Sequence, residues 1–314
     1  MPLPATFRLS PFTTAEALAA GVSRGVIDGP QVRTLLPAVH LAADRPVTFA
    51  TLVAAARLVL PADALLTGPS ALRLAGATVG PVHPLHFVSR HPHQVRRRGV
   101  RVMRVRTLPP ASAGVVLLTE AFRASAAAVD LVELVAAGDH LVRSGRCRPE
   151  ELCTAAEGWS GRGSVAARRA ALLVRDRVDS PRETELRLCL VLAGLPEPEC
   201  NVLLGGPAEP IGRFDLVLRA LRVALEYEGD QHRTDLAQWN ADILRHEQLA
   251  GEGWRLVRVT AARLARPHGV LALVVQTLRT AGYTGPDPVL SEEWRRLFAP
   301  SARKLRLQHA FDST

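Results

Sequence analysis

The sequence predicts a mixed α/β protein with more than one domain, and three observations lead to this expectation. The chain has 314 residues, of which 47% are hydrophobic, enough to bury a sizeable core in two or three domains. Residues 180–260 carry, in order, the signals of a helix, a strand hairpin, a second helix and a further strand. Residues 1–110 hold 13 arginines and 4 acidic residues, whereas the other 204 residues hold 26 of each sign. The formal net charge of +9 therefore lies in an N-terminal part that we expect to face a polyanion.

The sequence shows no sign of a membrane span or of a disulfide framework. No run of 18 apolar residues occurs, and the start Met1-Pro2-Leu3-Pro4 has no basic segment followed by an apolar one. We therefore expect no membrane partner and a cytoplasmic location. The cysteine spacings match neither a zinc pair nor a disulfide framework, so reduced thiols are expected at Cys147, Cys153, Cys189 and Cys200.

The first expected elements are two helices and a strand pair. The segment Thr13–Glu16 has the spacing of a capping box, and Ser23 can begin a second helix. Glycines and Pro30 cut that second helix short, and residues 32–43 alternate as a strand pair does. This order resembles the winged-helix domain of AbiEi-type antitoxins, whose second helix enters the DNA major groove. A domain that only packs and reads no bases is the alternative.

An arginine-rich segment follows two helices expected at 49–60 and 70–74 and a strand expected at 85–89. Six arginines fall within residues 96–106. Arginine binds phosphate through two parallel hydrogen bonds, which favours a nucleic-acid contact. The candidate nucleic-acid-binding residues are Arg96, Arg97, Arg98 and Arg101. The alternative is a solvated hairpin edge whose charges discourage aggregation.

The rest of the chain is expected to form a helical connector, an α/β domain and a tail. Pro109 and Pro110 mark a boundary, and residues 119–178 are rich in alanine, leucine and arginine. Ser180-Pro181-Arg182-Glu183 is a strong helix start, which gives Glu183 a structural role. The expected domains are a winged-helix-like basic domain at 1–108, the connector at 109–178, the α/β domain at 179–285 and a partly ordered tail at 286–314.

Three acidic residues lie on a predicted hairpin within the α/β domain. Residues 214–218 and 222–228 predict two strands joined by a tight connection. Strand alternation places Glu226 and Glu228 on one face, and a loop with an even number of residues places Asp215 there too. Like charges about 4 Å apart repel by roughly 4 kcal/mol at an effective dielectric constant of about 20, so such a cluster needs a proton or a cation. Carboxylate oxygens favour Mg²⁺ and then Mn²⁺. A solvated strand face is the alternative.

The same acids carry a family resemblance. Asp215, ten residues, Glu226, one residue and Glu228 resemble the PD-(D/E)XK nuclease signature. The ordered blocks around them, over about 180–265, are similar to the DUF559 group, relatives of the very-short-patch-repair endonucleases. Those blocks include Ser180–Leu186, Gly194–Pro196, Arg213–Asp215, Val223–His232, Gln238–Leu249 and Gly253–Thr260. Glu228 stands where the signature has lysine, and Lys304 is the only lysine of the sequence.

The resemblance implies a restriction-endonuclease-like αβββαβ core that hydrolyses phosphodiester bonds in DNA with Mg²⁺ or Mn²⁺. The implied metal ligands are Asp215, Glu226 and the backbone carbonyl of Tyr227. The candidate catalytic residues are Asp215, Glu226, Glu228, Glu183, His232 and Arg245. Glu228 adds a ligand or holds a water, Glu183 completes the outer shell, and Arg245 and His232 face the phosphate. Two alternatives stay open: a DNA-binding regulator or antitoxin with an inert nuclease domain, and a protein–protein module of a defence system.

Overall fold

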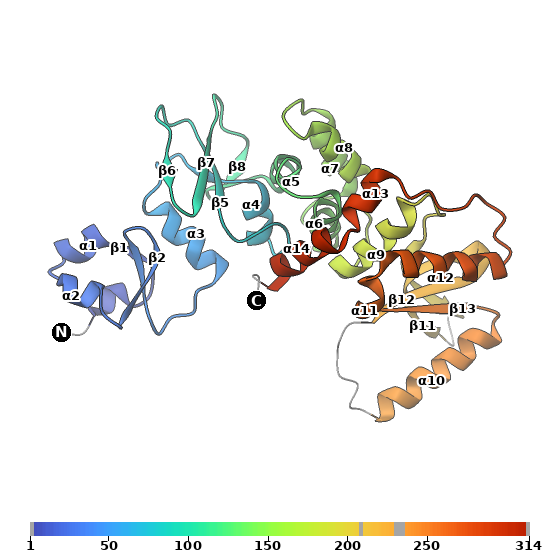
Figure 1. Cartoon of the computed structure of the whole chain (residues 1–314). Coiled ribbons are helices and arrows are strands. Elements are labelled where there is room, and N and C mark those ends of the chain that lie inside the picture. The colour runs from blue at the N-terminus through green and yellow to red at the C-terminus, as the bar shows by residue number, and fades with distance from the viewer. Residues whose placement is uncertain (1–2, 207–209, 229–235, 312–314) are drawn as a thin grey trace. The chain divides into compact units, whose positions relative to one another are not determined.

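The structure is a computed structural model that describes residues 3–206, 210–228 and 236–311. The chain divides into two compact units. Unit 1 comprises Met1–Val129, Glu151–Arg168 and Gln308–Thr314, and unit 2 comprises Asp130–Glu150 and Arg169–Leu307. Both units contain helices and strands (Figure 1), which confirms the predicted mixed α/β class. No helix within the described ranges is long and apolar enough to cross a membrane.

Unit 1 begins with a small antiparallel sheet of strand order β1-β3-β2. Its elements are η1 (Ala5–Phe7), β1 (Phe12–Thr13), α1 (Thr14–Ala19), α2 (Arg24–Ile27), β2 (Val32–Leu36) and β3 (Val39–Ala42). The predicted capping box is present, because Thr13 and Glu16 each accept the backbone N–H of the other. The helix α2 is a single turn, since Gly29 and Pro30 follow it closely.

A second sheet of unit 1 carries the arginine-rich segment. Its strand order is β6-β7-β5-β4-β9-β8, which places β6 at an edge. The elements are α3 (Phe49–Arg57), β4 (Leu65–Leu66), α4 (Gly68–Leu74), β5 (Leu85–Ser89), β6 (Arg96–Arg97), β7 (Val100–Arg104), β8 (Ala111–Ser112), β9 (Val115–Val116) and α5 (Leu118–Ser125). The strand predicted at 85–89 is confirmed, and the two predicted helices are present with shifted ends.

Helices lead from the second sheet of unit 1 to the sheet of unit 2. They are α6 (Leu131–Arg143), α7 (Pro149–Glu157), α8 (Ser164–Leu173) and α9 (Pro181–Val191). The helix α9 begins as predicted, because the Ser180 hydroxyl accepts the N–H of Glu183 at 3.2 Å and Pro181 occupies the first helical position. Residues 119–178 are thus helical, as their composition predicts.

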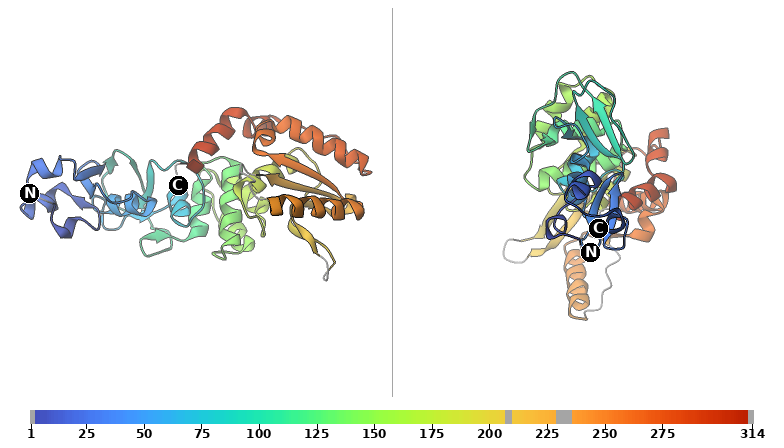
Figure 2. Two further views of the ribbon diagram at one scale, coloured as in Figure 1. Left: turned by 90° about the horizontal axis from the view of Figure 1, so that it is seen from below. Right: turned by 90° about the vertical axis from the view of Figure 1, so that its left-hand side faces the viewer.

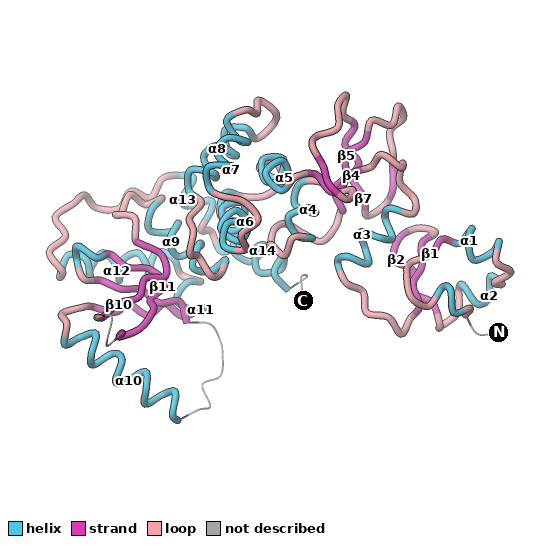
Figure 3. The backbone as a smooth tube through the Cα atoms, turned by 180° about the vertical axis from the view of Figure 1, so that it is seen from behind, coloured by secondary structure: helices cyan, strands magenta, loops and turns pink. Residues whose placement is uncertain are grey.

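The sheet of unit 2 has the strand order β10-β11-β12-β13. Its strands and the elements that follow them are β10 (Glu199–Gly205), β11 (Pro210–Leu218), η2 (Arg219–Leu221), β12 (Val223–Glu228), α10 (Leu236–Gly251), β13 (Arg255–Thr260), α11 (Ala261–Leu264) and α12 (Pro267–Thr280). The pairs β10–β11 and β11–β12 are antiparallel, whereas β12 and β13 are parallel. Figure 3 shows β10 and β11 side by side. The predicted hairpin is the antiparallel pair β11–β12. Its connection is η2 followed by Arg222, whose backbone is left-handed.

Helices cover both faces of this sheet. The helices α9 and α12 pack on one face, and α10 lies on the other (Figure 1, Figure 2). Apolar side chains from the strands and from α10, among them Phe214, Val217 and Leu249, form a buried cluster. This cluster anchors α10 against β11, which fixes where the polar side chains of α10 reach the sheet.

Residues 286–314 were expected as a partly ordered tail, and the structure instead gives them two helices. They are α13 (Glu292–Leu297) and α14 (Pro300–Phe311). Trp294 is fully buried, and its indole N–H donates to the carbonyl of Cys189 on α9 at 2.8 Å. Arg303 and Arg306 of α14 contact the buried Glu185 at 3.3 Å and 3.1 Å. One buried tryptophan and these ion pairs order a segment whose composition alone predicts little structure.

Candidate active site

The strands β11 and β12 part from each other beside Asp215. The antiparallel pairing of the two strands ends at Leu216 and Leu225, and the same register places Asp215 opposite Glu226. There the Asp215 carboxylate takes a backbone partner, because its Oδ2 accepts the N–H of Tyr227 at 2.7 Å. We call this place the fork. The fork consists of Asp215, Glu226, Tyr227 and Glu228.

Burial and neighbouring acids raise the pKa of Asp215 to about 6. Loss of hydration is the largest cause, and the charges of Glu183 and Glu226 act in the same direction. The N–H of Tyr227 and the charge of Arg213 oppose this increase. The described residues give Asp215 a hydrogen bond at Oδ2 alone. The fork therefore holds a carboxylate whose negative charge the chain compensates only in part.

Glu183 combines the two roles that its sequence position suggested. It lies in the first turn of α9, and its Oε2 accepts the N–H of Asp179 at 2.9 Å and the side-chain amide of Asn201 at 2.6 Å. These bonds fix a side chain that is 7% exposed. Its charge also reaches Asp215, whose pKa it raises. The helix start thus adds the charge of a fourth carboxylate to those of Asp215, Glu226 and Glu228 at the fork.

Arg245 reaches Glu226 from α10. Its guanidinium forms an ion pair with Glu226 Oε1, donates to the carbonyl of Arg213 at 3.2 Å and stacks 4.3 Å from the ring centre of Phe214. Gly212 makes room for it: a Cβ atom there would lie 2.6 Å from Arg245 Nε, and the glycine has a φ of +153°. Burial raises the pKa of Glu226, and Arg245 opposes that increase. Arg245 is thus a cation already placed at the fork.

Arg258 was not among the candidates, yet it contacts Glu228 of the fork and His246 of α10. The parallel register of β12 and β13 places it beside Glu226, its Nε lies 3.2 Å from Glu228 Oε1, and it contacts the ring of His246 on α10. The signal that could have revealed it is the alternation of Val257-Arg258-Val259, once β13 is aligned in parallel with β12. Its charge helps to compensate the acid that stands at the expected lysine position.

The oxygen atoms at the fork match the chemistry of a hard divalent cation. Carboxylates and a backbone carbonyl are the ligands that Mg²⁺ and Mn²⁺ prefer. A cation would also stabilise the ionised form of Asp215, which burial and like charges disfavour. Among the residues that the structure describes, no three acidic, histidine or cysteine side chains converge as a ready set of ligands, and Glu226 and Glu228 face arginines. The oxygen atoms at the fork thus suit a divalent cation. In this structure, the guanidinium groups of Arg245 and Arg258 contact Glu226 and Glu228.

The remaining candidates belong to unit 1 or fall outside the described residues. His232 falls in the segment 229–235, which lies outside them. Arg96, Arg97, Arg98 and Arg101 lie on the β6–β7 hairpin of unit 1, and all four are exposed. In the described part of the chain, no acidic side chain forms an ion pair with any of these arginines. The hairpin therefore presents uncompensated positive charge to solvent.

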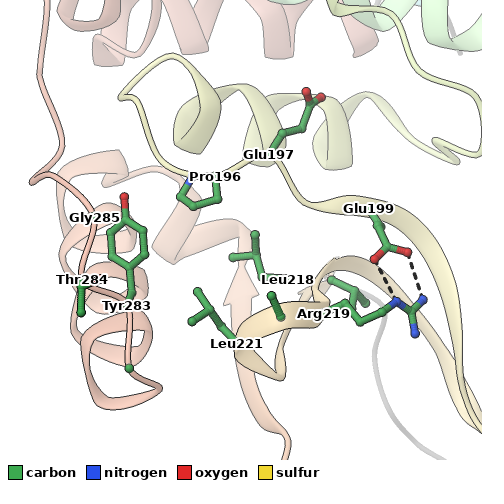
Figure 4. A pocket seen from close by; sticks show the side chains of 12 residues that line it. Pro196, Glu197, Glu199, Leu218, Arg219, Leu221, Tyr283, Thr284 and Gly285 are labelled. Carbon is green, nitrogen blue, oxygen red and sulfur yellow. Dashed lines mark hydrogen bonds and ion pairs between the residues drawn. The ribbon is translucent and has the colours of Figure 1, made fainter.

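A hollow of about 740 Å³ lies beside the connection between β11 and β12 (Figure 4). Its wall includes Leu218, Leu221 and Tyr283, and at its edge Arg219 binds both oxygens of Glu199, at 2.9 Å and 3.0 Å. None of the candidate site residues is part of its wall. The ion pair at its edge is already complete, so the hollow offers no charge to a substrate phosphate.

Comparison with known proteins identifies two relatives without a described activity. The chain is 33% identical over 135 residues to the uncharacterized protein MT2308 of Mycobacterium tuberculosis strain CDC 1551 / Oshkosh, and equally to the uncharacterized protein Rv2248 of strain ATCC 25618 / H37Rv. The match covers 43% of this chain, and the chain spans about half the length of these curated relatives. No protein-family model matches the chain. No solved structure matches it either.

Proposed function

We propose that the chain hydrolyses phosphodiester bonds in DNA with a divalent cation held at the fork, and that it acts in the cytoplasm. The observation that carries the proposal is the half-buried Asp215, whose pKa burial and the charges of Glu183 and Glu226 raise to about 6. A group with so perturbed a pKa, set where two strands part, is a candidate for chemistry.

The order of elements supports the proposal. The helix α9, the strands β10, β11 and β12, the helix α10 and the strand β13 follow one another as αβββαβ. This is the order that the resemblance to the DUF559 group and the PD-(D/E)XK nucleases implies. The acids of the signature lie on β11 and β12, and Arg245 comes from the following helix. Sequence spacing and local geometry thus point to one site.

The roles follow from the contacts at the fork. Asp215, Glu226 and the carbonyl of Tyr227 would hold Mg²⁺ or Mn²⁺, which supplies acidification of a bound water and compensation of phosphate charge. Glu183 keeps Asp215 in an environment that favours a cation. A guanidinium group has no acceptor and does not exchange a proton readily, so Arg245 would contribute charge toward the phosphate and take no part in proton transfer. Glu228, which contacts Arg258, would add a ligand or hold a water.

The nucleic acid would be bound chiefly by the β6–β7 hairpin. The order of α1, α2, β2 and β3 agrees with a winged-helix-like arrangement, but α2 has a single turn. A helix of that length presents few side chains to a major groove, whereas the exposed arginines of the hairpin suit phosphate oxygens. Binding is therefore expected to depend on backbone phosphates more than on base sequence.

The test is the nicking of supercoiled plasmid by the full chain with Mn²⁺, with Mg²⁺ and with EDTA. The wild type should nick only with a metal, and Asp215→Asn should lower the rate by orders of magnitude with DNA affinity little changed. Glu199→Gln is the matched control, because it removes one carboxylate charge of the same sheet from an exposed ion pair. Wild-type inactivity with every metal, or equal activity of Asp215→Asn, would contradict the proposal.

A DNA-binding regulator with an inert nuclease domain is the second candidate. It is favoured by the ion pairs of Glu226 with Arg245 and of Glu228 with Arg258, since these acids already have cations of the chain's own. The same assay separates the two candidates. A regulator predicts DNA binding without nicking, and no increase in the wild-type melting temperature on addition of Mg²⁺ or Mn²⁺.

A further inference from the structure

A groove of about 640 Å³ opens beside the arginine-rich hairpin within unit 1. One wall is formed by the end of β2, with Leu35, and by the following turn, with Pro37. The other is formed by Pro84 and by the turn between β6 and β7, with Arg98. Its volume lies in the range of about 300–1,000 Å³ that small-ligand clefts occupy. The groove is therefore large enough for one planar ring with its attached sugar.

The glycine at the β6–β7 turn keeps the two walls close together. Gly99 has a φ of +79°, and a Cβ atom there would lie 3.1 Å from a methyl group of Leu36 and 3.6 Å from His83 Nδ1. The carbonyl of Gly99 also lies 3.4 Å from that imidazole nitrogen. A glycine that both accepts a left-handed conformation and allows close approach suits a groove with a defined shape.

The charge around the groove is positive. Arg98 lines it, and the neighbouring Arg96, Arg97 and Arg101 are exposed. Arg96 lies directly opposite Arg101 in the β6–β7 register, so two like charges stand side by side on an edge strand pair. A bound polyanion would remove that repulsion. The combination is a cationic edge next to an apolar wall of leucine and proline.

A nucleic acid with unpaired nucleotides matches both properties. Its phosphates suit the arginines, and an unstacked base offers the apolar ring face that the groove would cover. In a duplex the bases are stacked and only their edges reach the grooves, so a duplex leaves the apolar wall without a partner. We propose that the groove between the β2–β3 and β6–β7 turns binds an unpaired nucleotide, with Arg98 on its phosphate. This inference rests on the proposed function, in which nucleic acid is the partner, and it specifies which form of it the chain prefers.

The test is fluorescence anisotropy of the full chain carrying Asp215→Asn, in EDTA, with a labelled single strand and with a duplex of the same sequence. The single strand should bind more tightly than the duplex. Arg98→Gln should weaken binding of the single strand and lower the slope of log K against log salt by about 0.7. Leu35→Ser should weaken binding of the single strand at least roughly fivefold and leave the duplex unchanged.

Two matched variants serve as controls. Met103→Ser removes an apolar side chain that is 54% exposed on β7 and is not part of the groove wall, and Arg296→Gln removes an exposed arginine on α13. Both should bind as the parent does. The inference is overturned by tighter binding of the duplex, by an unchanged affinity of Arg98→Gln, or by equal losses for Leu35→Ser on both forms. Competition by polyglutamate as strong as by the single strand also overturns it, since any acidic polymer would then suffice.

The outcomes separate this inference from the proposed function. Binding is measured without metal and on a chain that is not expected to cleave. Single-strand preference in a protein that never nicks plasmid would support the groove and refute the hydrolase. Metal-dependent nicking by a protein that prefers duplex would refute the groove and support the hydrolase.

Discussion

The fork and a site between α6 and α9 both place acidic side chains away from solvent within unit 2, and these acids are compensated differently. Asp139 of α6 is 1% exposed, and both of its oxygens have partners: Oδ1 accepts the N–H of Arg175 at 2.7 Å, and Oδ2 accepts from the Thr184 hydroxyl at 2.7 Å and from Arg187 at 3.2 Å. Arg187 is fully buried and also donates to the carbonyl of Leu173 at 2.8 Å. We call Asp139 and Arg187 the buried pair.

At the fork the compensation is incomplete. Asp215 is half-buried, and the charges of Glu183 and Glu226 raise its pKa, whereas Arg245 pairs with Glu226. One helix thus contributes to both places, because α9 carries Glu183 toward the fork and Arg187 into the buried pair. The difference teaches that burial of an acid does not by itself mark a site. A candidate site is indicated by an acid that has fewer hydrogen-bond and ion-pair partners than its negative charge requires.

The largest change in stability is expected at the buried pair. Arg187→Met should lower the free energy of unfolding by about 3–5 kcal/mol, because it leaves the Asp139 carboxylate buried without its cation. Urea unfolding measures the change. The double variant Arg187→Met with Asp139→Leu should recover much of the loss, since no unpaired charge then remains. Arg219→Met, which breaks an exposed pair with Glu199, is the control and should cost about 1 kcal/mol or less.

Added Mg²⁺ should leave the loss at the buried pair unchanged. An Arg187→Met variant that is as stable as the wild type, or that magnesium restores, would remove the contrast between the two places.

Much of the fork could be predicted from the sequence because its determinants are local. Strand alternation relates Glu226 to Glu228, and an even-numbered connection relates Asp215 to Glu226, so a few adjacent residues determine the register. The capping signals at Thr13 and Ser180 are local in the same sense, and both are present in the structure. These features depend on dihedral geometry and on hydrogen bonds within one or two turns.

The remaining contacts could not be predicted because they join segments distant in sequence. Asp139 lies within the predicted helical connector, and it is buried because α6 packs against α9. Arg258 lies at the fork through a parallel register that no local pattern specifies. Trp294 orders the C-terminal helices by meeting Cys189, 105 residues earlier. Packing between distant segments determines such contacts, and the hydrophobic periodicity of the sequence does not predict them.

The pH dependence of stability tests the environment of Asp215. The folded state raises the pKa of Asp215 from 3.8 to about 6, so it holds that proton to a higher pH than the unfolded chain does. The resulting stability is present below about pH 4 and is lost as the pH rises through about 6. Its size is at most about 3 kcal/mol, since one pKa unit corresponds to about 1.4 kcal/mol and partial exposure reduces it. Urea unfolding in EDTA should show the wild type losing stability relative to Asp215→Asn over that interval.

Glu199 provides a control of opposite sign. Hydrogen bonds from Arg219 lower the pKa of Glu199, so its contribution is present at neutral pH and is lost as the pH falls through the folded-state pKa. The stability difference between the wild type and Glu199→Gln should therefore change in the opposite direction. Parallel curves for the wild type and Asp215→Asn would show that Asp215 is not held in the environment described.

The smallest of these effects concerns how Arg245 reaches the fork. Gly212→Ala adds a Cβ atom 2.6 Å from Arg245 Nε and 3.1 Å from its Cδ, at a φ of +153° that other residues rarely adopt. The expected loss of stability is about 1–2 kcal/mol. Gly269→Ala is the control, because Gly269 lies in α12 with no atom within 4 Å of an added Cβ, and alanine there should be neutral or stabilising by up to about 1 kcal/mol.

Arg245→Met should make the Gly212→Ala substitution less costly, since the clash is then with a shorter, flexible side chain. If Gly212→Ala lowers the stability as much in the Arg245→Met background as in the wild type, glycine is needed at position 212 only for its backbone conformation. The position of the Arg245 guanidinium at the fork would then not depend on the space that Gly212 leaves. The difference in charge compensation between the fork and the buried pair would rest on Asp215 alone.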